Sequence, residues 1–226
     1  MMDMDIKLAV FDLAGTTVKD DDFVAQAFIA AFQHEGIEVT AADVNPWMGV
    51  RKTQAIAEVL YAKCGEVIPE LVDRIHDSFV GAMVEFYSDS NQVTPMDGAE
   101  ELFRSLQSRG IRVAVNSGFP RVIVDAILLR FGWIWEGLVD DSIASDEVPA
   151  GRPFPHMIRA LMDRGGIVLP GQVMKVGDTT VDIEEGRQAE CGLVIAVTTG
   201  ANKREELAEY APDHIIDHLE AIHGLV

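Results

Sequence analysis

The chain has few cysteines and few basic residues, and it lacks any long apolar run. Its two cysteines, Cys64 and Cys191, are far apart and form no metal-binding spacing, so we expect buried thiols in a reducing compartment. No run of about 18 apolar residues occurs, so we expect no membrane-spanning segment. The amino terminus has no basic and apolar stretches typical of a signal peptide, and a cytoplasmic location is expected.

Acidic residues outnumber basic ones, with 37 Asp and Glu against 18 Lys and Arg and a formal net charge of -19. No basic stripe offsets this charge, which argues against nucleic-acid binding. An anionic small-molecule substrate would therefore need a local positive pocket, built from a few Arg, Lys and metal charges.

The rest of the composition is that of a globular protein with a substantial core. Of the 226 residues, 48% are hydrophobic and 24% are charged, which fits one large domain or a core with a smaller insert. Strand-like apolar runs alternate with helical patterns, which favours βαβ units and a parallel sheet. The runs cover residues 7–13, 111–117, 138–142, 173–177 and 193–197. The helical patterns cover residues 99–109, 122–131, 155–164 and 182–189. We predict an α/β, Rossmann-like core.

Residues 18–93 interrupt this alternation, because they contain helical patterns and no convincing strand. Asp22 is placed to cap the first of these helices. The sequence therefore predicts an α/β core of residues 1–16 and 95–226 and a helical cap domain of residues 17–94. The large apolar residues of this cap domain are expected to pack in the cap core or in a homodimer interface. They are Phe28, Phe32, Phe79 and Met83.

The segment from residue 7 to residue 17 carries the strongest functional signal. An apolar run ends at Asp12, and Gly15 forces a turn directly afterwards. Open α/β sheets bind their ligands at the carboxyl ends of strands, where an acid serves as a nucleophile, a metal ligand or both. Two residues later stands Ala14, which has no side chain that could move a proton.

Two further polar elements follow later strands and should meet Asp12 at the same sheet edge. Ser117 and Gly118 end the second run, where a hydroxyl and backbone amides can bind a phosphoryl oxygen. Arg152 follows the third run across a loop, and its planar guanidinium can hold an anion or orient a carboxylate.

The fourth apolar run ends in two carboxylates, Asp178 and Asp182. Convergence of Asp12 and Asp178 suits Mg²⁺, a hard cation that takes oxygen ligands. Asp182 either supports the site or stabilises the start of the following helix through charge–dipole attraction.

In this order, the strand-end Asp12, Ser117, Arg152 and Asp178 resemble the motifs of the haloacid dehalogenase superfamily. The resemblance implies that Asp12 is the nucleophile that forms an aspartyl-phosphate and also binds Mg²⁺. It implies two more metal ligands and two supporting residues around them. The ligands are the Ala14 carbonyl and Asp178, and the supporting residues are Asp182 and Thr16.

Two departures from the phosphatases of that superfamily point to one subgroup. The usual second aspartate is replaced by Ala14, and the usual lysine before the last motif by Arg152. Both features resemble the phosphonoacetaldehyde hydrolase (phosphonatase) subgroup. Members of that subgroup use a cap lysine to form a Schiff base with an aldehyde substrate, and the matching residue here is Lys52.

Elementary electrostatics supports Lys52 independently. Gly49, which we also expect to border the substrate, precedes a helical pattern, so Lys52 should lie in a first helical turn. The positive end of the macrodipole and the neighbouring Arg51 both lower the lysine pKa and supply the neutral amine that an imine requires. A solvated lysine on a cap helix is the competing interpretation. Ala55 replaces a histidine of the subgroup, and Phe119 replaces a tyrosine.

The leading functional hypothesis is Mg²⁺-dependent hydrolysis of the C–P bond of phosphonoacetaldehyde or a related aldehyde phosphonate. The first alternative is a phosphatase that hydrolyses a small phosphate monoester. The second is a catalytically inactive fold that acts as a binding module. His214 and His218 have i, i+4 spacing that can hold a metal, but their acidic surroundings favour a solvated face.

Overall fold

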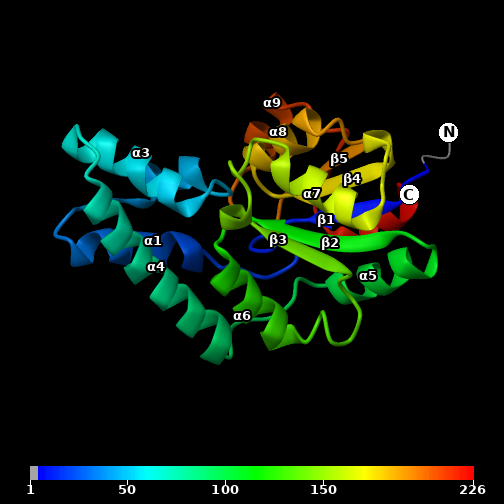
Figure 1. The fold of residues 1–226 in the computed structure, drawn as a ribbon, viewed down its shortest axis with the longest axis horizontal. Helices are drawn as coiled ribbons and strands as arrows, with labels where there is room; N and C mark the ends of the chain where they lie inside the picture. The colour runs from blue at the N-terminus through cyan, green and yellow to red at the C-terminus, as the bar shows by residue number, and fades with distance from the viewer. Residues whose placement is uncertain (1–4) are drawn as a thin grey trace.

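The computed structural model describes residues 5–226, in which a parallel sheet and a group of inserted helices lie beside each other (Figure 1). The sheet has six strands, all parallel to their neighbours, in the order β3-β2-β1-β4-β5-β6. The strands are β1 (Leu8–Phe11), β2 (Arg112–Ser117), β3 (Asp141–Ala144), β4 (Val173–Gly177), β5 (Leu193–Val197) and β6 (His214–Ile216). The predicted α/β class with a parallel core is confirmed.

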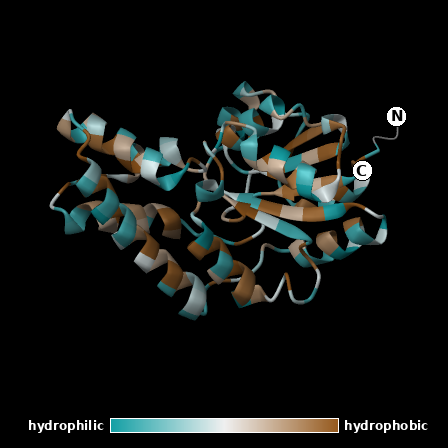
Figure 2. Cartoon of the chain, in the orientation of Figure 1, coloured by the Kyte–Doolittle hydropathy of each residue, from teal (hydrophilic) through white to brown (hydrophobic). Residues whose placement is uncertain are grey.

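Helices cover both faces of the sheet. One face packs against α5 (Ala99–Ser108) and η4 (Leu219–Gly224), and the other packs against α7 (His156–Gly165) and α8 (Thr180–Gln188). The remaining core helices are α6 (Arg121–Phe131), α9 (Arg204–Glu209), η2 (Ser145–Glu147) and η3 (Pro170–Gln172). The inner strands β1 and β5 are wholly apolar because both of their faces are covered, whereas β2, β3 and β4 also carry polar residues, which appear as teal segments in Figure 2.

The insert follows β1 and consists of helices. They are α1 (Phe23–His34), α2 (Ala41–Val44), η1 (Asn45–Trp47), α3 (Lys52–Cys64) and α4 (Pro69–Asp89). Phe28, Phe79 and Met83 are fully buried between them, as expected for an apolar core of this insert. The long helix α4 packs along α6, and Arg130 of α6 donates hydrogen bonds to the carbonyls of Ser88 and Ser90.

The chain enters and leaves the insert through two adjacent segments. Val18 forms one bridge with Ala14 and another with Pro95, and the Lys19 N–H donates to the Thr94 carbonyl at 3.1 Å. These pairings bring both crossings to the edge of the core, next to the end of β1. The crossings fall near the predicted domain boundaries at residues 17 and 94, which remain a prediction.

Two local expectations were wrong, one strand was missed, and one helix cap differs in detail. The third strand begins at Asp141 rather than at residue 138, since Leu138 and Val139 instead turn back to the Trp133 carbonyl. The three-residue strand β6 was not predicted, because it is too short to show a periodicity. Asp22 is the N-cap residue of α1, as predicted, but its side chain makes no capping hydrogen bond; Asp20 accepts one from the Val24 N–H at 3.0 Å instead.

The second wrong expectation concerns Cys64, which is exposed, whereas Cys191 is buried as expected. His214 and His218 are both exposed, and His214 lies in β6 rather than on a helix. Within residues 5–226, none of the helices combines the length and the apolar character that crossing a membrane requires.

Candidate active site

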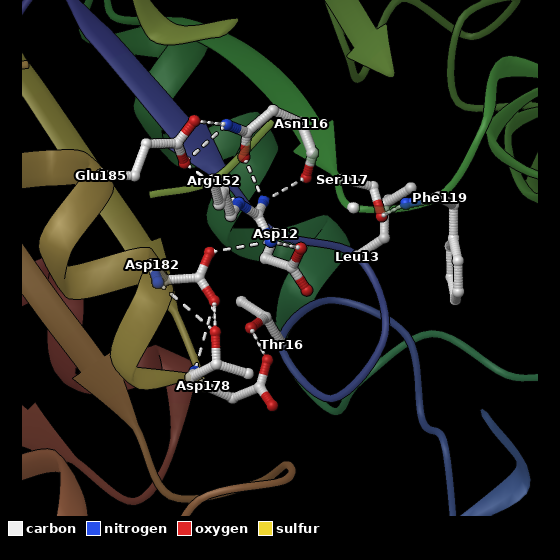
Figure 3. Close-up of polar contacts among 12 residues, drawn as sticks. Asp12, Leu13, Thr16, Asn116, Ser117, Phe119, Arg152, Asp178, Asp182 and Glu185 are labelled. Carbon is white, nitrogen blue, oxygen red and sulfur yellow. Dashed lines mark hydrogen bonds and ion pairs between the residues drawn. The ribbon is translucent and has the colours of Figure 1, made fainter. Parts of the chain in front are cut away.

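The site lies where the sheet order reverses, at the carboxyl ends of β1 and β4. Asp12 directly follows β1 and Asp178 directly follows β4, and these two strands are neighbours. Asp182 projects from the first turn of α8 toward them, and oxygen atoms of the three carboxylates lie within 4.8 Å of one another (Figure 3). The predicted convergence of Asp12 and Asp178 is therefore present in the structure.

Glycine at two positions lets the chain approach the Asp178 carboxylate closely. Gly15 has φ +85°, and a Cβ atom there would lie 2.7 Å from Asp178 Oδ2. A Cβ atom on Gly200 would overlap the same oxygen. The approach lets the Thr16 hydroxyl donate to Asp178 Oδ1 at 2.9 Å and the Ala201 N–H to Oδ2 at 2.8 Å. Thr16 thus holds Asp178, as a supporting residue would.

Arg152 is fully buried behind Asp12 and fixes its orientation. Its Nη1 donates to Asp12 Oδ1 at 2.6 Å and lies 3.1 Å from Asp182 Oδ1. Its Nη2 bonds to both Asn116 oxygens, and its Nε donates to Glu185 at 3.0 Å. Among the described residues, no side chain or backbone group donates a hydrogen bond to Asp12 Oδ2. This oxygen is therefore free to face the cavity that Asp12 lines.

The buried network contains more negative than positive charge. The buried carboxylates belong to Asp12, Asp178, Asp182 and Glu185, and the buried cations belong to Arg152, Lys175 and Lys52. Four carboxylates therefore face three cations, and a bound metal cation would offset the remaining negative charge.

The pKa shifts show which carboxylates lack a compensating positive charge. Burial, together with the charges of Asp12 and Asp182, raises the pKa of Asp178 well above its ordinary value. Burial also raises the pKa of Asp12, against the opposing charge of Arg152. Arg152 and Lys175 overcome the effect of burial at Asp182 and lower its pKa. The unbalanced carboxylates are therefore Asp12 and Asp178, so these two fit a metal and Asp182 fits a supporting role.

The residues expected to bind a phosphoryl group lie across the cavity from Asp178. Ser117 is buried at the end of β2, where its hydroxyl accepts a hydrogen bond from the Phe119 N–H at 3.2 Å. Ser117 and Gly118 line the same cavity as Asp12 and Ala14. Gly118 must lack a side chain, because a Cβ atom there would overlap the carbonyls of residues 49 and 50.

The inserted helices close over this cavity. Gly49 has φ +78°, and a Cβ atom there would lie 2.5 Å from the Thr179 hydroxyl. Arg51 donates hydrogen bonds to the carbonyl of Ser145 in η2 and to that of Val148, which follows η2. The loop before α3 is therefore packed directly on the core, in a closed arrangement.

Lys52 begins α3, as predicted, and only 3% of it is exposed. It lines the cavity together with Asp12, and its Nζ lies 5.6 Å from the ring centroid of Phe28 and 5.3 Å from that of Phe119. Burial lowers its pKa from 10.5 to about 8, against the opposing charges of Asp12 and Asp20. The predicted direction is therefore correct, but burial is the main cause rather than the macrodipole or Arg51.

Sequence reasoning missed three members of the buried network and one carboxylate of the cavity. Asn116 and Glu185 join Arg152 to Lys175, whose Nζ donates to Asn116 Oδ1 at 2.6 Å. Glu185 follows Asp182 by three residues, so it lies on the same buried face of α8, and this spacing was the available signal. The missed cavity residue, Asp20, had no comparable signal.

With this geometry established, comparisons with known proteins identify the family. A model of the haloacid dehalogenase-like hydrolases matches residues 6–190. The chain belongs to this family. Phosphonoacetaldehyde hydrolase from Bacillus cereus (strain B4264) is 30% identical over 198 residues, which cover 82% of this chain and 74% of that protein. The hydrolase described here is phosphonatase-like, as its motifs indicated.

Solved structures share the fold of this hydrolase. A phosphonoacetaldehyde hydrolase-like protein from Oleispira antarctica gives a TM-score of 0.84 at 23% identity, covering 98% of this chain and 91% of that one. A predicted phosphoglycolate phosphatase from Haemophilus somnus 129PT gives 0.83 at 24% identity, covering 98% of each chain. The shared fold includes the helical insert of a haloacid dehalogenase-like hydrolase, and it does not distinguish the two substrates.

Proposed function

We propose that this hydrolase cleaves the C–P bond of phosphonoacetaldehyde or a related aldehyde phosphonate. The observation that carries the proposal is the presence of the Lys52 amine and the Asp12 carboxylate in one closed cavity. A lysine pKa of about 8 leaves roughly one amine in ten neutral at pH 7, against about one in three thousand at the reference value. Lys52 is therefore poised to condense with an aldehyde.

The proposed reaction uses both side chains in sequence. Condensation of the Lys52 amine with the aldehyde forms a C=N bond and releases water. Asp12 Oδ2 then attacks phosphorus, and the electron pair of the breaking C–P bond moves into the iminium to give an enamine on Lys52. Hydrolysis of the aspartyl-phosphate releases phosphate, while protonation and hydrolysis of the enamine release acetaldehyde and free Lys52.

The residue at position 14 agrees with this route. A phosphate monoester leaves as an alkoxide that needs a proton, whereas the carbon leaving group here passes its electrons to the iminium. No acid is then required beside Asp12, and Ala14 offers only its backbone carbonyl to the site.

We further propose that the site binds Mg²⁺ through Asp12, Asp178 and the Ala14 carbonyl. The two unbalanced carboxylates support this set, and Mg²⁺ would neutralise phosphoryl oxygens and help to orient them. Ser117, Gly118 and Gly49 lie where they can surround a phosphonate, and Arg152 holds Asp12 in place.

Entry of a substrate requires the closed arrangement to open. We propose that residues 17–94 act as a cap that moves about the paired crossings near residues 17–21 and 91–95, and that closure excludes water. The contacts of Gly49 with Thr179 and of Arg51 with Ser145 support a closed state in which Lys52 meets Asp12.

A phosphatase acting on a small phosphate monoester is the second candidate. The replacements at Ala55 and Phe119 favour it, because they remove groups that the phosphonatase subgroup carries beside its lysine. Phosphate release with Mg²⁺ should be compared between phosphonoacetaldehyde and a panel of monoesters. Faster turnover of phosphonoacetaldehyde supports the proposal, and turnover of monoesters alone would replace it with the phosphatase.

A further inference from the structure

A carboxylate outside the metal site borders the active-site cavity. Asp20 lies on the crossing from β1 to α1, where its Oδ1 accepts the Val24 N–H at 3.0 Å and so holds the start of α1. Its side chain lines the same cavity as Lys52 and Asp12. Of the described residues that line this cavity, four are titratable, and Asp12 and Asp178 are the proposed Mg²⁺ ligands. Asp20 is the remaining carboxylate in the cavity that holds the Lys52 amine.

The charged and titratable groups around Asp20 come from three elements. Lys52 at the start of α3 lines the cavity with it, Tyr87 of α4 is close enough for the Asp20 charge to affect its pKa, and Asp21 and Asp22 precede α1 with it. Burial raises the pKa of Asp20 to about 6, while the Lys52 charge opposes the rise. Asp20 therefore gains and loses a proton in the range in which the enzyme is expected to work.

Neither Tyr87 nor α3 offers an alternative base. Tyr87 is fully buried, its hydroxyl has no hydrogen-bond partner within residues 5–226, and burial with the nearby Asp20 charge raises its pKa well above the ordinary value. One turn along α3 from Lys52 stands Ala55, which is fully buried and cannot carry a proton. Phe119 lies against Lys52 without a hydroxyl.

We propose that Asp20 is the general acid–base residue of imine formation at Lys52, an inference that rests on the proposed function. The Asp20 carboxylate first takes a proton from the Lys52 ammonium, and the neutral amine forms an N–C bond to the aldehyde carbon. A proton moves from nitrogen to oxygen to give the carbinolamine. The Asp20 carboxyl then donates its proton to the hydroxyl, the C–O bond breaks, water leaves, and the nitrogen lone pair forms the iminium.

A purely electrostatic role for Asp20 predicts faster imine formation when its charge is removed, whereas a proton-transfer role predicts slower imine formation. Its negative charge raises the pKa of Lys52, so it disfavours the neutral amine. If Asp20 acted only as a charge, Asp20→Asn would increase the neutral fraction and speed imine formation below pH 8. If Asp20 transfers protons, the same substitution slows imine formation. The sign of the effect separates the two roles.

The test is the rate at which borohydride traps a phosphonoacetaldehyde adduct on Lys52, followed by mass spectrometry. Asp20→Asn suits it because the amide oxygen can still accept the Val24 N–H. The matched control is Asp22→Asn, an exposed neighbour without a capping hydrogen bond. We expect Asp22→Asn to react like wild type and Asp20→Asn to be slowed about 100-fold, as is typical for loss of a general acid–base group.

Trapping by Asp20→Asn at the wild-type rate or faster would overturn this inference alone. Absence of any wild-type adduct would instead refute the Schiff-base function, and this inference with it. The wild-type pH profile is a second measurement that does not depend on the variant. The proposed step starts with Asp20 deprotonated and Lys52 protonated. The trapping rate should therefore peak between pH 6 and 8. A profile that only rises through pH 8 overturns the inference.

Discussion

The Arg152 guanidinium donates a hydrogen bond of 2.6 Å to Oδ1 of Asp12, and both groups are buried at the end of β1. The contact fixes one carboxylate oxygen and leaves Oδ2 toward the cavity that Lys52 also lines. Arg152 therefore connects the nucleophile to the buried network around Asn116 and Glu185. This arrangement makes the stability of the core and the orientation of Asp12 depend on the same side chain.

Arg152→Lys should damage both properties. A lysine keeps the charge but cannot replace the planar fork, so Asn116 and Glu185 lose buried partners. We expect the free energy of unfolding to fall by about 2–4 kcal/mol and turnover to fall at least about tenfold. Urea unfolding and phosphate release measure the two effects. Arg164→Lys, at a half-exposed position, should change neither, and an unimpaired Arg152→Lys would contradict the role given to Arg152.

Asp12→Asn should remove the nucleophile while keeping the size of the side chain. We expect phosphate release to fall by at least about 10³-fold, because both the attacking oxygen and one metal charge are lost. Mg²⁺ affinity, measured by calorimetry, should fall as well. Asp125→Asn alters an exposed carboxylate of α6 and serves as the control. Turnover of Asp12→Asn near the wild-type level would rule out the aspartyl-phosphate.

Gly118→Ala should hinder closure of the inserted helices. The added methyl group would overlap the carbonyls of Gly49 and Val50, so the cap loop would have to move away from the core. We expect kcat/KM to fall about tenfold or more, while the free energy of unfolding changes little. Gly171→Ala is the control, because a Cβ atom there meets nothing within 4 Å. Equal kinetics for the two variants would contradict closure as a requirement for catalysis.

Asp20→Asn should stabilise the protein at neutral pH. Burial raises the pKa of Asp20 to about 6 from 3.8, so the folded state binds more protons than the unfolded state between these values. The free energy of unfolding therefore falls as pH rises from about 4 to 6, by up to about 3 kcal/mol. The variant avoids this loss, and we expect a gain of about 1–3 kcal/mol at pH 7 that disappears near pH 4. A gain that is independent of pH would contradict the assigned burial.

Much of the site was predictable because strand ends are visible in the sequence. The apolar runs before Asp12, Ser117 and Asp178 indicated strands, and parallel strands bring their carboxyl ends to one edge. Lys52 was placed at a helix start by Gly49 and the pattern that follows it. These positions depend on local patterns, and the structure brings them into one cavity.

The parts that sequence reasoning missed depend on tertiary contacts. Glu185 and Asn116 matter because they hold Arg152 and Lys175 through buried contacts; the spacing of Glu185 from Asp182 indicates a shared helix face but does not identify these partners. Asp20 lines one cavity with Lys52 only because the inserted helices fold back over the core. The lowered pKa of Lys52 was expected from the helix macrodipole, whereas burial supplies most of it, and burial cannot be determined without the packed structure.

The most direct test of the account is borohydride trapping on Lys52 with Lys52→Arg as the comparison. Arginine keeps the positive charge at this buried position but cannot form an imine. The account predicts that phosphonoacetaldehyde and borohydride leave a reduced adduct on Lys52 of the wild type, and that Lys52→Arg folds but neither forms the adduct nor turns over. An active Lys52→Arg variant, or a wild type with no adduct, would contradict the Schiff-base route and leave Lys52 as a charge that attracts an anionic substrate.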